Sequence, residues 1–370
     1  MAAAGTLRAG SAEALSAFTP LPEQTYLDTA SYGLPPKETV GALERALADW
    51  ASGRAQWSRD WDPAGDDCRR LVAPLLGSRP DRIALMPAGS SAVALVGSGL
   101  RANDEVVVPD DEFTSVLYPL LVAAGDRGAR VRRVPYDRLG DAVTPATTML
   151  AFSHVRSNGG YRQDLRALAD AAHGAGATIL VDATHSAGLL PVPSLELGLD
   201  HVVVSAYKHL LCPRGVAFLH VAEAAQERMR PLSASWRGAV DLRPYGGDLG
   251  DLLPDAARFD VSLAWHPWVG ARSSLGFLSR FDPADLESWV GGLATGLAKR
   301  LGVEPTGSSV LTIPVSIEPS ELGARLEVAG IRAALNGPGV RFSFHLYNTP
   351  EDMERAAAFL EGMDLGTGAR

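Results

Sequence analysis

The fold of this chain is decided by two stretches near its middle, TILVDATH (residues 178–185) and VVVSAYKH (residues 202–209). Each begins with a short apolar run rich in β-branched residues, which is typical of a buried strand, and each ends in polar residues. In an α/β sheet, the last residues of such strands reach the crevice at the carboxyl edge, where ligands bind. We therefore expect Asp182 and Lys208 to meet in one site.

A carboxylate and an amine in one crevice suit the cofactor pyridoxal 5'-phosphate (PLP). A lysine amine forms a Schiff base with its aldehyde, and an aspartate keeps its pyridine nitrogen protonated. Lys208 must lose a proton to attack an aldehyde, and burial lowers the pKa of a lysine. Asp182 could instead cap a helix that starts at Thr184 or His185. His185 could contact the phenolic oxygen of the cofactor or hold a structural place at that helix start.

Strands alternate with helices from residue 81 to residue 220, which predicts an α/β fold with a mostly parallel sheet covered on both faces. From about residue 268 the pattern changes to helix, strands at 310–318 and 340–346, and a last helix from about 350. A helix over 37–52 carries an apolar stripe of Val40, Leu43, Leu47 and Trp50. We expect three parts: an N-terminal arm (1–36), a large PLP-binding domain (37–265) and a small α+β C-terminal domain (266–370).

Composition excludes several classes of protein. Hydrophobic residues make up 46% and charged residues 21% of the 370, as in an ordinary soluble enzyme. The formal net charge of −9 argues against nucleic acid or an anionic membrane as the main partner. Two cysteines, no CxxC and no signal-peptide core point to the cytoplasm, and we expect no metal site. No apolar run of about 20 residues is present, so no membrane span is expected.

Three further places could hold parts of a cofactor or substrate. Gly89, Ser90 and Ser91 follow the strand 83–86 and open a helix, where backbone N–H groups bind phosphate, although most such turns are plain helix caps. Phe113 follows the strand 105–109 and could stack on a cofactor ring or lie in the core. Arg341 shares one face of a strand with Ser343 and His345; its guanidinium could bind a carboxylate or lie on an edge strand.

Together these segments resemble the fold type I PLP enzymes of the class V aminotransferase and cysteine desulfurase group. The resemblance runs from about Tyr26 to Met363 and implies a seven-stranded-type sheet, PLP, and a homodimer with shared active sites. The segments that carry it are YLDTA (26–30), AGS (88–90), SHVRSNGG (153–160), VDATHSAG (181–188), SAYK (205–208), FDVS (259–262) and Arg341 with YNT (347–349).

The resemblance also implies roles for single residues. Phe113 stands where the family places its ring-stacking aromatic residue, and His185 stands where glutamine is common. Arg341 corresponds to the clamp for the substrate α-carboxylate. The remaining implied cofactor contacts are Ser157 or Asn158 against the cofactor, Ser205 and Tyr207 at the phosphate, and Ser262 at the phosphate of the other subunit.

Within that group, the chain is most similar to the C–S lyases of ergothioneine biosynthesis, through SHVRSNGG, AYKH (206–209) and WHPW (265–268). This implies β-elimination from hercynylcysteine sulfoxide, a small amino-acid sulfoxide, to ergothioneine, pyruvate and ammonia. Aromatic faces bind quaternary ammonium groups, although most tryptophans are core or interface residues. The candidates for the trimethylammonium group are Trp57, Trp61, Tyr161, Trp265 and Trp268, and those for the second carboxylate are Arg54, Arg59 and Arg272.

The nearest alternatives are a cysteine desulfurase and an aminotransferase or epimerase of the same group. A desulfurase needs a mobile thiol of low pKa. Residues 310–341, where the family keeps that thiol, contain no cysteine, and we expect Cys68 and Cys212 to be structural. A PLP-fold module that only binds is a third alternative, but it would not need a base at Lys208.

Overall fold

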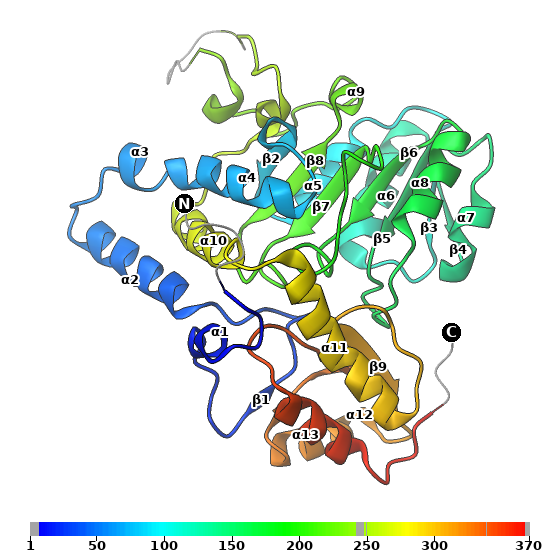
Figure 1. Ribbon diagram of the computed structural model, residues 1–370. Coiled ribbons are helices and arrows are strands. Elements are labelled where there is room, and N and C mark those ends of the chain that lie inside the picture. The colour runs from blue at the N-terminus through cyan, green and yellow to red at the C-terminus, as the bar shows by residue number, and fades with distance from the viewer. Residues whose placement is uncertain (1–6, 242–247, 249, 338, 367–370) are drawn as a thin grey trace.

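A seven-stranded sheet in the order β2-β8-β7-β6-β5-β3-β4 forms the centre of the molecule (Figure 1). The computed structural model describes residues 7–241, 248, 250–337 and 339–366. Strand β8 runs antiparallel to β2 and β7, and the other neighbouring pairs are parallel. The predicted α/β fold with a mostly parallel seven-stranded sheet is confirmed. The strands are β2 (Ile83–Met86), β3 (Glu105–Pro109), β4 (Arg130–Val134), β5 (Met149–Ser153), β6 (Thr178–Asp182), β7 (His201–Ser205) and β8 (Ala217–Val221).

The edge strand β4 was not predicted, because its sequence RVRRV carries three arginines. These arginines are tolerated since β4 lies at the sheet edge and its neighbour β3 begins with the buried Glu105. The carboxylate of Glu105 lies 3.0 Å from Arg130 and 3.1 Å from Arg132. Charge pairing across the two strands thus replaces the apolar pattern that marks the other strands.

Helices cover both faces of the sheet because alternate strand residues point to opposite sides. On β7, Val203 joins the core under α5 (Gly89–Gly97) and α6 (Thr114–Arg127). Its neighbours Val202 and Val204 join the core of the other face. The helices on that face are α4 (Pro63–Leu75), α7 (Leu139–Ala142), α8 (Leu165–Gly174) and α10 (Trp265–Leu278). This two-sided burial explains the continuous apolar runs in the strands.

Helix α2 (Lys37–Ala51) lies where it was predicted, but most of its apolar stripe is exposed. Trp50 is 63% exposed, and Val40 and Leu47 are also exposed, whereas Leu43 is partly buried. The buried residues of α2 are Thr39 and Ala46, which lie at one edge of the stripe. The short helices α1 (Ala12–Ser16) and α3 (Trp57–Asp60) flank α2 in the chain. In this single chain, the predicted stripe therefore does not pack into the core.

The C-terminal part contains a three-stranded antiparallel sheet in the order β11-β12-β9. The predicted strands were too long: β9 ends at Pro314 and β12 ends at Ser343, so His345 lies beyond the strand. The two domain boundaries stay a prediction. The elements are β9 (Val310–Pro314), β11 (Ala334–Asn336), β12 (Gly339–Ser343), α11 (Pro283–Leu301), α12 (Pro319–Val328) and α13 (Pro350–Leu360).

The N-terminal segment packs against this C-terminal part. Strand β1 (Thr25–Tyr26) pairs in parallel with β10 (Ile331–Arg332), and a further parallel bridge joins Asp28 to Ser343. The motif YLDTA is thereby placed beside the strand that carries Arg341. Among the described helices, none combines the length and apolar character that a membrane span requires.

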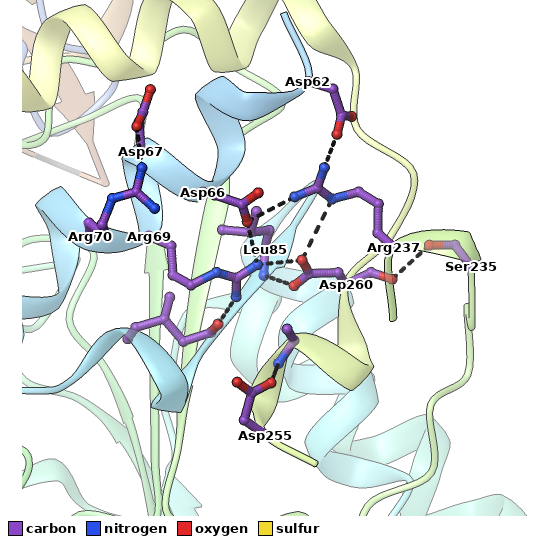
Figure 2. Close-up of polar contacts among 12 residues, drawn as sticks. Asp62, Asp66, Asp67, Arg69, Arg70, Leu85, Ser235, Arg237, Asp255 and Asp260 are labelled. Atoms are coloured by element: carbon purple, nitrogen blue, oxygen red, sulfur yellow. Dashed lines mark hydrogen bonds and ion pairs between the residues drawn. The ribbon is translucent and has the colours of Figure 1, made fainter. Parts of the chain in front are cut away.

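A buried network of ion pairs joins the short 3-10 helix η3 (Trp236–Gly238) and the residue after η4 (Ala256–Phe259) to β2 and α4 (Figure 2). The short helix α9 (Glu223–Gln226) lies upstream of both in the chain. Asp260 accepts a hydrogen bond from the Leu85 N–H of β2 at 2.9 Å and pairs with Arg69 of α4 at 2.5 Å. Arg237 pairs with Asp62 and lies 3.7 Å from Asp260. The side chains of Arg69, Arg237 and Asp260 are almost fully buried.

We expect Asp260→Asn to destabilise the fold, because removing one partner of a buried ion pair leaves uncompensated charge. The expected loss in the free energy of unfolding is about 3–5 kcal/mol, measured by urea denaturation. Glu321→Gln is the matched control, since its pair with Arg325 is exposed and is worth at most about 1 kcal/mol. Equal losses for the two variants would contradict this assignment.

Candidate active site

Lys208 lies in the connection between β7 and β8, at the carboxyl edge of the sheet, and is 6% exposed. Its Nζ is 3.2 Å from Nε2 of His185 and 5.2 Å from the centroid of the Phe113 ring. The N-terminal segment approaches closely: the Gly33 N–H donates to the Tyr207 carbonyl at 2.9 Å. A Cβ on Gly33 would lie 2.3 Å from the Lys208 carbonyl oxygen, so this approach requires glycine.

Burial lowers the pKa of Lys208 from 10.5 to about 8, because the charged ammonium loses water. The positive charge of Arg341 lowers this pKa further, whereas the carboxylate of Asp182 raises it. The Lys208 amine is therefore unprotonated far more often near neutral pH than a surface lysine amine. That property is required of a nucleophile or a base.

Asp182 is the last residue of β6, and a turn follows it instead of a helix. Its Oδ1 accepts a hydrogen bond from the Thr184 N–H at 2.8 Å, and the Thr184 hydroxyl accepts one from the Ser205 N–H at 2.9 Å. The alternative in which Asp182 caps a helix is therefore wrong: the carboxylate closes a turn. Thr184, which sequence reasoning did not select, ties the end of β6 to the end of β7.

His185 is buried beside Lys208, and burial holds its pKa well below the usual value, so its imidazole is neutral. The hydroxyl of Ser157 lies 3.4 Å from the same Nε2 that faces Lys208. Nδ1 of His185 is buried, and no described residue forms a hydrogen bond with it. Asn158 is exposed, and its carbonyl accepts a hydrogen bond from Asn336 at 3.3 Å. The geometry therefore places Ser157, rather than Asn158, against His185.

Helix α5 begins at Gly89 and has no side-chain cap, because its N-cap residue is Ala88. Its first N–H groups are thus free of a competing side-chain acceptor, as a phosphate site requires. A Cβ on Gly89 would lie 2.5 Å from the Ser205 hydroxyl, so glycine allows this close approach. Ser90 and Ser91 lie on the first turn and are partly buried. Gly89, Ser90, Ser91 and Ser205 are therefore gathered at one helix N-terminus.

Phe113 is partly exposed, and its ring lies over the Lys208 amine. Its backbone is fixed by Glu112, which sequence reasoning missed. Glu112 accepts hydrogen bonds from the Phe113 N–H at 2.7 Å and from the Ser153 N–H and hydroxyl at 2.8 and 2.6 Å. Ser153 pairs in register with Asp182. Burial raises the pKa of Glu112 to about 7. The signal in the sequence was an acidic residue directly before the aromatic one.

Arg341 extends from β12 toward the same site. Its Nη1 donates to the Ser157 carbonyl at 3.2 Å, and its Nη2 donates to the Ser31 hydroxyl at 3.1 Å. Oδ1 of Asp28 lies 3.8 Å from Nη2, and the buried Nε has no hydrogen-bond partner in the described part of the chain. Burial lowers the pKa of Arg341. A guanidinium with an unused donor beside a nucleophilic lysine is suited to bind a carboxylate.

The remaining predicted residues lie elsewhere or have other partners. Ser262 is exposed, and no hydrogen bond joins it to the site residues around Lys208, so its contact with a second subunit stays a prediction. Trp268 is a core residue against Phe218 and is therefore unsuited to bind a ligand. Tyr207 stacks under Arg214. The predicted arginines Arg54, Arg59 and Arg272 pair with Asp49, Asp60 and Asp67.

Four other tryptophans form an aromatic cluster around the start of α10. Trp57 and Trp265 stack with ring centroids 5.0 Å apart, and Trp61 and Trp236 lie against them. The Trp265 N–H donates to Asp62 at 3.1 Å, which connects the cluster to the ion network of Figure 2. Within the described residues, no group of three His, Cys, Asp or Glu side chains could hold a metal ion.

Residues 25–240 match the model of the family described as aminotransferase class-V. The chain belongs to this family. Its members are PLP enzymes, so PLP is the cofactor of this chain. The structure fits that cofactor: the uncapped α5 terminus suits the phosphate, the buried Asp182 suits the pyridine nitrogen, and the desolvated Lys208 suits the aldehyde.

Known proteins of several activities are similar to the chain. Isopenicillin N epimerase of Amycolatopsis lactamdurans is 28% identical, over 92% of this chain and 96% of that protein. A probable cysteine desulfurase of Methanothermobacter thermautotrophicus is 27% identical, over 92% and 95%. The cysteine desulfurase CsdA of Escherichia coli has the same fold, with a TM-score of 0.82 and 23% identity over 95% and 97% of the two chains.

We predict that the Lys208 amine in the cofactor-free protein reacts with an amine-specific acylating reagent at a rate that rises through a pH of about 8. Asp182→Asn should move this midpoint to lower pH, because the carboxylate raises the pKa of Lys208. Peptide mass spectrometry of the labelled protein against pH measures both midpoints. A midpoint near the ordinary lysine value, or an upward shift in Asp182→Asn, would contradict the prediction.

Proposed function

We propose that this protein is a PLP-dependent C–S lyase that cleaves hercynylcysteine sulfoxide by β-elimination to a sulfenic acid, pyruvate and ammonia, and that an external thiol supplies the two electrons that reduce the sulfenic acid to ergothioneine. The observation that carries the proposal is the state of the two thiols. Cys68 is 0% and Cys212 4% exposed, and burial raises the pKa of both. Neither thiol can supply the accessible thiolate that a desulfurase uses to accept sulfur. Sulfur would therefore leave with the product.

The side chains around Lys208 supply the remaining functions. PLP, when bound, supplies an electron sink for the bond broken at Cα. The guanidinium of Arg341 would hold the substrate α-carboxylate and orient the Cα–H bond. The Lys208 amine would take the Cα proton at Nζ, since its lowered pKa favours the base form. Neutral His185 would stay beside that amine without adding positive charge.

A lyase of the same fold supports this proposal. The cystine C–S lyase C-DES, solved with its product cysteine persulfide, aligns with a TM-score of 0.84 over 93% of this chain at 18% identity. In that protein, the same fold accommodates cleavage of a carbon–sulfur bond. The match supports the reaction class as a proposal for this chain, and the substrate is proposed on the resemblance of its motifs.

The proposed substrate needs room for an imidazole and a trimethylammonium group. A cleft of about 970 Å³ lies next to the site and is lined by Tyr136, Tyr161 and Thr312, among others. Thr312 pairs in register with Arg341 across β9 and β12. Asp137, Glu304 and Arg156 also line the cleft, and Arg156 already lies over the Tyr136 ring, so Tyr161 is the aromatic face that we assign to a cation. We propose this cleft, through Tyr161, for the distal part of the substrate.

Epimerisation is the second candidate, because isopenicillin N epimerase matches nearly the full length of the chain. A lysine that removes a Cα proton serves both reactions, and they differ in whether a group on Cβ leaves. Incubation in deuterium oxide with an amino acid that lacks a leaving group separates the two. Rapid inversion with deuterium incorporation at Cα would favour the epimerase.

We also propose a homodimer with shared active sites. The exposed stripe of α2 includes Val40, Leu47 and Trp50, and the neighbouring Trp57 is exposed as well. Burial of such a surface against a second copy would remove apolar area from water. Ser262 is exposed in the single chain, as a residue that reaches toward a partner must be.

We expect the purified protein to release pyruvate from hercynylcysteine sulfoxide, and Cys68→Ala and Cys212→Ala to retain this activity. Lys208→Ala should lower kcat by at least about 10²–10⁴-fold, because it removes the base. Coupled lactate dehydrogenase reports pyruvate from the sulfoxide, and mass spectrometry after a separate incubation with cysteine reports persulfide on either thiol. Persulfide formation with alanine as product would replace the lyase by a desulfurase, and PLP-loaded protein without pyruvate release would remove the lyase proposal.

A further inference from the structure

Asp28 is a buried carboxylate that lies between two arginines. It is 4% exposed and belongs to the segment that approaches Lys208. Its Oδ1 is 3.8 Å from Nη2 of Arg341, and its Oδ2 is 3.9 Å from Nε of Arg332. Both distances exceed hydrogen-bond range. The carboxylate thus neutralises part of the local positive charge without a direct hydrogen bond to either guanidinium.

The guanidinium of Arg341 forms hydrogen bonds through Nη1 and Nη2. Its donors reach the Ser157 carbonyl and the Ser31 hydroxyl, whereas its buried Nε has no hydrogen-bond partner among the residues that the structure describes. The same described residues offer no hydrogen-bond partner to the buried Oδ1 of Asp28. A ligand carboxylate that binds Arg341 would arrive within a few ångströms of Asp28, inside a site from which water is largely excluded. Two carboxylates at such a distance do not both stay ionised easily.

We propose that Asp28 is a proton-linked counter-ion of Arg341: when a carboxylate ligand binds Arg341, the Asp28 carboxylate takes up one proton from solvent. The proton forms an O–H bond on Asp28, no other bond changes, and the net charge around Arg341 is conserved. Asp28 thereby sets the affinity of the site for carboxylates and makes it depend on pH. The inference rests on the proposed role of Arg341 as the carboxylate site and is independent of the identity of the substrate.

The groups that face Asp28 support this assignment. Burial raises its pKa above the ordinary value even in the free protein, although a hydrogen bond with the Ser31 hydroxyl and the charges of Arg341, Arg332 and Lys208 each lower it. Two tyrosines also face it, Tyr26 and Tyr347, and burial raises the pKa of each, so both are neutral. Of the three positive charges, Arg341 lowers the pKa of Asp28 the most, and a carboxylate bound to Arg341 would cancel this effect. The pKa of Asp28 would then rise further, which is the condition for proton uptake.

The direction of the pH effect is set by this linkage. The protein binds the ligand better when Asp28 is protonated than when it is ionised. Affinity is therefore highest at acid pH, and it falls as the pH rises from the pKa of Asp28 in the free protein to its higher pKa in the complex. Within that interval, the slope approaches about tenfold in Kd per pH unit. Above it, Asp28 stays ionised in the complex and the ligand binds weakly at all pH values.

The test uses the PLP-loaded enzyme and 3-(methylsulfinyl)propanoate, which has a carboxylate and a sulfoxide but no amino group to react. Isothermal titration calorimetry in buffers of different ionisation enthalpy, across acid to neutral pH, counts the protons taken up per ligand bound. We expect uptake that approaches one proton for the wild type and none for Asp28→Asn. The Kd of Asp28→Asn should be independent of pH and lower than that of the wild type at the alkaline end.

Two carboxyl variants are matched controls. Glu112→Gln removes a neighbouring group whose pKa is about 7, and Asp111→Asn removes a half-buried carboxylate that pairs with Arg156. Both should keep the proton uptake. Uptake that persists in Asp28→Asn, uptake that is lost in Glu112→Gln, or wild-type binding without uptake would each overturn the proposal. If Asp28→Asn fails to fold, the proton count of the wild type and of Glu112→Gln decides.

Arg341→Met separates this inference from the proposed function. If the variant binds the ligand as tightly as the wild type, the proposed role of Arg341 is wrong. If binding is lost in Arg341→Met but the wild type takes up no proton, Arg341 remains the carboxylate site and the role of Asp28 is wrong. The visible spectrum of bound PLP checks in each variant that the cofactor site is intact.

Discussion

The structure depends on one desolvated amine. Lys208 stands at the carboxyl edge of a sheet whose strands are buried on both faces, and this burial lowers its pKa to about 8. The fold must keep water away from an ammonium group, which is costly unless compensating charge is near. Asp182 and Asp28 raise the pKa of the amine again, whereas Arg341 lowers it. The balance between burial and these charges keeps the amine available as a base and still able to carry a proton.

That balance requires segments far apart in the sequence to meet. The N-terminal segment reaches the Lys208 loop through Gly33, and the bridge between Asp28 and Ser343 joins it to the strand of Arg341. The ion network of Asp260, Arg69 and Arg237 likewise joins distant segments, because it fixes the residues around Asp260 to β2 and α4. Asp260 belongs to FDVS (259–262), so this motif has a structural role in the chain itself, separate from any contact that Ser262 makes with a second subunit.

The sequence predicted what local patterns encode. The strands that end at Asp182 and Ser205 were visible as apolar runs with polar ends, and the glycine at 89 marked a helix start. Strand β4 was missed because its stability comes from Glu105 across the sheet, and the outward-facing stripe of α2 could not be distinguished from a core stripe. Asp28 and Glu112 escaped because their partners lie distant in the chain, Arg341 for one and Ser153 for the other. A role set by long-range contacts leaves no periodic signal.

The same geometry explains why relatives with one fold carry different activities. With PLP bound, a base amine, a ring-binding carboxylate and a carboxylate clamp are enough to break the Cα–H bond, a step that epimerisation and β-elimination share. What happens after that step depends on further groups. A protein thiolate can take sulfur, a second protein base allows inversion at Cα, and a leaving group on Cβ of the substrate allows elimination. In this chain, the thiols of Cys68 and Cys212 are buried, and the cleft beside Thr312 carries acidic residues together with Arg156. The buried thiols are the observation on which we propose a lyase rather than a desulfurase for this chain.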